Sequence, residues 1–147
     1  MVDFGILSAI RQLICSERIG DDYGLLPSSI YVMKPDIAPK KWPAVFLELE
    51  ESWSTGCMPG MGSVALKISV LSNSKDGAEA LDIANQIRQL IDGSSIEVET
   101  CYEATFRMNS SIVDMKKVAL APRKVEQYYE AFVHIVGTKD VNGSINE

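Results

Sequence analysis

The chain has 147 residues, of which 46% are hydrophobic and 23% charged, and its formal net charge is -6. This length suits a single domain with one core, and the composition is ordinary for a globular protein. The acidic balance argues against a surface that grips nucleic acid, because phosphate contacts need clustered Lys and Arg.

No apolar run approaches the roughly 20 residues of a membrane span, and the first residues do not resemble a signal peptide. The three cysteines, Cys15, Cys57 and Cys101, are widely spaced. They predict neither a disulfide framework nor a metal motif, so a reducing cytoplasm is the simplest setting.

The segment from Asp3 to about Arg18 has the apolar spacing of a helix laid on a core. A short strand is predicted from Ile30 to Met33. The stretch from Pro43 to Gly93 then encodes a strand, a long loop, a second strand and a helix.

In that stretch, apolar residues at every second position predict two half-buried strands. The long loop is expected from Glu51 to Ser63. Asp76 and Glu79 form a capping-box pattern at the start of the helix, and Gly93 suits a left-handed cap at its end.

The alternation from Ile96 to Arg107 predicts one more long strand, and a last strand from Val125 to Val136 is expected near the centre of the sheet. Residues 108–124 stay open, with a short strand from Ile112 to Val118 as one option. The fold class is therefore α+β, with a mixed, mostly antiparallel sheet and both helices on one face. Residues 1–137 form one domain and 138–147 a flexible tail.

The sequence contains little that indicates a catalytic site. A thiol mechanism requires a cysteine beside His134, which is the only histidine, and nothing in the sequence brings them together. The glycines around Met61 lead into a strand, whereas phosphate-binding loops lead into a helix. No catalytic residue, cofactor or metal is predicted.

The long loop is predicted to contact a partner, because large apolar side chains beside glycines are typical of interfaces. The alternative is a partly disordered hairpin tip. The candidate interface residues are Trp53, Cys57, Met58 and Met61.

Glutamates recur at the outward positions of the predicted strands. A solvated sheet face is the usual explanation; in a ring, the same face would line an acidic channel that repels DNA phosphates. Lys67 is expected to face Glu48 across the first strand pair. The residues of this acidic face are Glu48, Glu50, Glu97, Glu99, Glu103, Glu126 and Glu130.

The sequence resembles the phage tail-terminator or tail-completion superfamily, which includes proteins similar to the minor tail protein U of lambda. The resemblance rests on the amphipathic N-terminal helix and on "WPAVFLELE", "VALKISVLSNSKDGAEALDIANQIRQLIDG" and "VEQYYEAFVHIVG". It covers most of the chain, from about Phe4 to Gly137.

The resemblance implies a virion protein, assembled in the bacterial cytoplasm, that caps the tail tube as a homohexameric ring without enzymatic activity. Its implied partners are the tail-tube protein, a head-completion or connector protein and a sheath protein, while DNA passes through unbound. Two alternatives stay open: a head-completion or neck protein, and a small ligand-binding or enzymatic α+β domain.

Overall fold

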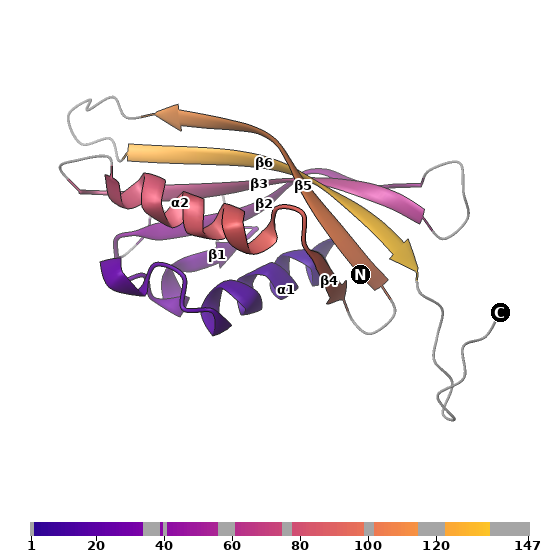
Figure 1. The fold of residues 1–147 in the computed structure, drawn as a ribbon, viewed down its shortest axis with the longest axis horizontal. Helices are drawn as coiled ribbons and strands as arrows, with labels where there is room; N and C mark the ends of the chain where they lie inside the picture. Colours follow the sequence, from indigo (N-terminus) through magenta and orange to yellow (C-terminus); the bar gives the residue numbers. More distant parts are fainter. Residues whose placement is uncertain are drawn as a thin grey trace.

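In the part of the chain that the structure describes, six strands form a mixed sheet with two α-helices packed on one of its faces (Figure 1). The computed structural model describes residues 2–33, 39, 41–55, 61–74, 78–98, 102–114 and 123–135, with the backbone alone at 2–4, 51–55, 61, 102, 114 and 135. The predicted α+β class is confirmed. The helices and strands are α1 (Val2–Ser16), β1 (Ile30–Val32), β2 (Ala44–Thr55), β3 (Met61–Ser72), α2 (Ala78–Ile91), β4 (Ser95–Val98), β5 (Tyr102–Asp114) and β6 (Arg123–Ile135).

The strands lie in the order β1-β2-β3-β6-β5-β4. β1 runs parallel to β2, and the other neighbours are antiparallel. β6 lies between β3 and β5, which confirms its predicted central place.

The helices divide the sheet between them. α2 packs on β3, β6 and β5, and α1 packs on β2 and on the two edge strands, β1 and β4. Because α1 contacts both edges, the sheet must curl around it. The core between the layers is apolar, and its largest fully buried side chains are Tyr129, Phe106, Ile6, Leu7, Ile10, Ile14, Leu47, Leu66, Ile68, Ile83, Ile87 and Ile91.

α1 ends in a Schellman motif, in which the last turn is closed by a left-handed residue. The amide of Ile19 donates to the carbonyl of Ile14, and the amide of Arg18 donates to the carbonyl of Cys15. Arg18 takes the left-handed conformation, with φ 53°. Glycine usually occupies such a position, so the sequence carried no clear signal for this helix end.

At the end of α2, Gly93 has φ 78°, as its predicted capping role requires. At the start, Asp76 lies outside the described residues. Glu79 accepts a hydrogen bond from the Ser72 hydroxyl, which also accepts one from the amide of Ser74. The strand end and the helix start are therefore tied together by Ser72.

The single strand predicted from Ile96 to Arg107 is wrong. The chain reverses between β4 and β5, which pair antiparallel with Val98 opposite Tyr102 and Ile96 opposite Ala104. These partners are four and eight positions apart in sequence, both even numbers, so the alternation of faces continues unchanged through the reversal. No Gly, Pro, Asn or Asp between Val98 and Tyr102 signals the turn.

The long loop predicted from Glu51 to Ser63 is also wrong in its limits. β2 continues to Thr55 and β3 begins at Met61, with Thr55 opposite Gly62. The pairing has irregularities between Leu49 and Glu51 and between Glu51 and Ser54, which interrupt the alternation that marks a strand in sequence. In the open region, β5 extends to Asp114, so the optional strand at Ile112 is the end of β5; positions 115–118 lie outside the described residues.

Candidate functional site: the helix-free face of the sheet

The predicted acidic residues that the structure describes share one face of the sheet, opposite the helices. Core side chains such as Leu47, Ile68 and Val133 mark the helix side of their strands, so the side chains at the alternate positions point to the other face. Glu99 lies outside the described residues. The helix-free face carries Glu48 and Glu50 from β2, Glu126 and Glu130 from β6, Glu103 from β5 and Glu97 from β4.

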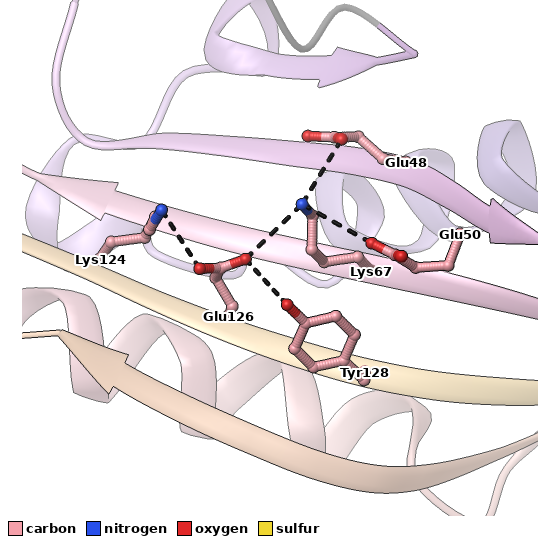
Figure 2. Close-up of polar contacts among 6 residues, drawn as sticks. All are labelled: Glu48, Glu50, Lys67, Lys124, Glu126 and Tyr128. Carbon is pink, nitrogen blue, oxygen red and sulfur yellow. Dashed lines mark hydrogen bonds and ion pairs between the residues drawn. The ribbon is translucent and has the colours of Figure 1, made fainter.

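Lys67 stands at the centre of an ion-pair cluster on this face (Figure 2). β3 lies between β2 and β6, so its lysine reaches carboxylates on both neighbours. The Lys67 Nζ atom lies 3.8 Å from Glu48, 3.7 Å from Glu50 and 3.6 Å from Glu126. The predicted contact between Lys67 and Glu48 is confirmed, and the two residues are directly opposite in the strand pairing.

Glu126 has two further partners that sequence reasoning missed. Lys124 Nζ lies 3.2 Å from Glu126 Oε1, and the Tyr128 hydroxyl donates to Glu126 Oε2 at 3.1 Å. Both partners sit two positions away on β6, so they share its face. The alternation of β6 was the available signal for both.

The environment shifts the pKa values within this cluster. Burial lowers the pKa of Lys67, but the nearby charges of Glu48, Glu126 and Glu50 raise it by more, so the net change is upward. Burial raises the pKa of Glu126, but Lys124, Tyr128 and Lys67 together bring it below its ordinary value. Burial and the hydrogen bond to Glu126 raise the pKa of Tyr128. Both shifts favour the charged forms of Lys67 and Glu126, while Tyr128 is held in its neutral form.

The β4 and β5 end of the face is different. Glu97 lies directly opposite Glu103, and both side chains are exposed. Glu103 in turn faces the exposed His134 on β6, and Arg107 faces Glu130. The uncompensated negative charge is thus concentrated along the β4 and β5 hairpin, away from Lys67.

A shallow hollow of about 240 Å³ lies over the Lys67 cluster. Its lining holds two carboxylates and two ammonium groups, so it gives no preference for an anion or a cation. The ring of Phe46 at its edge stacks on Tyr31, with centroids 4.9 Å apart. The hollow is lined by Pro39, Phe46, Glu48, Lys67, Ser69, Leu71, Lys124 and Glu126.

The predicted interface residues are not brought into one loop. Trp53 falls within β2 and Met61 within β3, while Cys57 and Met58 lie outside the described residues. Across the β3 and β6 pair, Met61 stands opposite His134. The interface role of these four residues stays a prediction.

No protein-family model matches the chain, and no curated protein matches it. Among solved structures, it is similar to a chain described as "Virion of native gene transfer agent (GTA) particle". The TM-score is 0.69 at 14% sequence identity, and the match covers 87% of this chain and 93% of that chain. The two chains share a fold.

Within that fold, the described residues hold no group of three or more His, Cys, Asp or Glu side chains arranged to bind a metal ion. Cys15 packs partly buried against the core on α1, while His134 is exposed on the opposite face, and Cys101 lies outside the described residues. Neither of the two described helices is long and apolar enough to cross a bilayer.

Proposed function

We propose that this protein is a structural component of a phage-like virion, where it caps the tail tube as a ring, ends tail polymerisation and joins tail to head. The supporting observation is the fold it shares with a chain of the gene transfer agent virion. The match spans nearly all of both chains, so it concerns the whole unit and not a common supersecondary motif.

In the proposed hexameric ring, the helix-free face lines the channel. Charge along the β4 and β5 hairpin would keep DNA from adhering to the wall, because like charges repel the phosphates. The compensated cluster around Lys67 contributes less to this repulsion. DNA would then pass without specific binding.

The remaining surfaces would meet the tail-tube protein, a head-completion or connector protein and a sheath protein. The segment that includes Trp53, Cys57, Met58 and Met61 is the proposed contact with the tube or a neighbouring subunit. The particle would be assembled in the bacterial cytoplasm, and the protein would reside at the neck of its tail.

A head-completion or neck protein is a second candidate, because the description of the similar chain names the virion without a place in it. Binding to isolated tail tubes distinguishes the first function, and binding to portal complexes the second. A ligand-binding or enzymatic domain is the weaker alternative, since the hollow over the Lys67 cluster is shallow and electrically balanced.

The first experiment is native mass spectrometry with negative-stain imaging of the protein, alone and with purified tail tubes. The proposal expects rings of six times the 16.2 kDa chain mass that sit on tube ends. A protein that stays monomeric and does not bind tube ends would overturn the proposal.

The second experiment replaces Glu97, Glu99 and Glu103 together by Lys. Rings should still assemble, while DNA delivery by the particles should fall, because the channel wall would then attract phosphates. The matched control reverses Glu17, Asp21 and Asp22, three exposed acids on the helix side with the same total charge. Equal delivery by both variants would contradict the acidic channel.

A further inference from the structure

Along the second half of β5, one edge has no partner strand among the described residues. β4 pairs with β5 only from Tyr102 to Thr105. Beyond that, the backbone of Phe106 bonds to Gly93 and Ser94, and the amide of Met108 donates to the Asp92 carboxylate at 3.0 Å. From Asn109 to Asp114, no described strand pairs with the side of β5 that faces away from β6.

Apolar side chains stand on both faces of this open segment. Ile112 is 52% exposed on the helix-free face, and Val113 is 46% exposed on the helix side, beyond the cover of α2. Figure 1 shows the arrowhead end of β5 standing clear of α2. Two neighbouring apolar residues on an open strand edge favour pairing with another chain.

The segment also lacks the features that usually block such pairing. Residues 109–113 read Asn-Ser-Ser-Ile-Val, with no Pro and no charge. The one irregularity lies before it, between Met108 and Ser110, and the pairing with β6 is regular from Ser110 to Asp114. A regular edge segment whose one charged residue is the terminal Asp114 can accept a strand.

The opposite edge of the sheet is better protected. β1 covers β2 only from Val45 to Leu47, so β2 has an open side from Glu48 onward. There the strand carries three glutamates, and its pairing with β3 has two irregularities. Charged residues and such irregularities both discourage pairing with another strand.

We propose that the open edge of β5 pairs antiparallel with the same edge of a second copy, about a two-fold axis at Ile112. Directly opposite residues must share a face, and this register meets that condition. It places Ile112 opposite Ile112 of the partner subunit, Ser111 opposite Val113 and Ser110 opposite Asp114. Both exposed apolar side chains become covered, and one continuous sheet spans the two copies.

Charge favours pairing of the β5 edge with the β5 edge of a second copy over pairing with its β2 edge. In the self-pairing, Asp114 meets the uncharged Ser110. The open β2 edge of a second copy would instead offer Asp114 a strand that carries Glu48, Glu50 and Glu51, and like charges opposite one another destabilise a sheet. The β5 edge is therefore complementary to itself.

This pairing does not depend on the proposed ring. The paired segment is short, so we expect a weak and reversible dimer of the kind typical of small interfaces. A dimer without rings would support the pairing and defeat the tail-capping role. Rings that form through other surfaces and are unchanged by substitutions on β5 would support the tail-capping role and defeat the pairing.

The test is sedimentation velocity of the full chain from about 5 to about 500 µM, a range chosen for weak association. The intact protein should shift from monomer to dimer, and Ile112→Lys should stay monomeric. Phe132→Lys is the matched control, because Phe132 is 45% exposed on the same face but lies on the central strand β6. It should dimerise like the intact protein, and circular dichroism should show both variants folded.

A second measurement fixes the register. Opposite residues in an antiparallel pair lie about 4.5 to 5.5 Å apart at Cα, within the range of a disulfide. Mild oxidation of Ile112→Cys should join position 112 of the two copies, detected by peptide mass spectrometry, whereas Phe132→Cys should give no link between its own positions. Equal sedimentation of Ile112→Lys and the intact protein, equal loss of the dimer in Phe132→Lys, or no link at position 112 would each overturn the proposal.

Discussion

The side-chain amide of Gln127 on β6 donates a hydrogen bond of 3.0 Å to the carbonyl of Ala84 in the middle of α2. Gln127 is buried, and its own carbonyl accepts from the Tyr129 hydroxyl at 2.9 Å. This buried relay joins the central strand to the helix above it, and it fixes how α2 sits along the sheet.

Removing one member of the relay should destabilise the fold. Tyr129→Phe leaves the Gln127 carbonyl unpaired, and Gln127→Leu leaves the Tyr129 hydroxyl unpaired, at a cost of about 1 to 3 kcal/mol each. The double variant should cost clearly less than the sum, because it removes both polar groups. Urea unfolding of the intact protein, the two single variants and the double variant gives a double-mutant cycle. Strict additivity would show that the two groups do not act together.

The Glu126 carboxylate should make the unfolding free energy fall as the pH is lowered. Its pKa in the folded protein lies below the ordinary 4.5, so its contribution is present above that pH and is lost as the pH falls through the folded value. Glu126→Gln lacks this contribution. The difference in unfolding free energy between the intact protein and the variant should therefore be larger at pH 7 than at pH 3.

Urea titrations at both pH values give that comparison, and Glu103→Gln is the control on the exposed part of the same face. A constant difference between Glu126→Gln and the intact protein across the two pH values would contradict the assignment.

The facing carboxylates of Glu97 and Glu103 should cost stability. Glu97→Lys converts a like pair into an opposite pair, which should raise the unfolding free energy by about 0.2 to 1 kcal/mol at low salt. In a Glu103→Gln background, Glu97→Lys should raise the unfolding free energy by less. An equal gain in both backgrounds would show that the benefit comes from net charge alone.

Gly20 and Gly24 have the same φ of 77° but different surroundings. A Cβ atom at Gly20 would lie 2.9 Å from Leu25, whereas one at Gly24 would meet nothing within 4 Å. Gly24→Ala should cost about 1 to 2 kcal/mol for the left-handed backbone, and Gly20→Ala a further 1 to 3 kcal/mol for the clash. Thermal unfolding of the two variants would show the difference, and equal midpoints would contradict it.

Local periodicity was enough to predict the helices, the faces of β2, β3 and β6, and the contact between Glu48 and Lys67. Each of these depends on residues close in sequence or on neighbouring strands of one hairpin. The reversal after Val98 was not predictable, because its residues keep the alternation and carry no turn signal.

The cluster around Lys67 needed the strand order as well. Its three carboxylates come from β2 and β6, strands that are far apart in sequence, and only the insertion of β6 beside β3 brings them together. The contact between Lys124 and Glu126, in contrast, depends only on the alternation within β6. Sequence predicted which face carries the charges and that Lys67 meets Glu48, but not that Glu126 joins them.

The place of β6 also has a consequence for how the chain folds. Without β6, the described strands form two separate groups, β1-β2-β3 and β5-β4, each with an unpaired edge. The strand that joins them is made after all the other described strands, so these strands can form one sheet only after β6 has been synthesised. Late closure through distant contacts predicts slow folding and a period in which half-built sheets can associate wrongly.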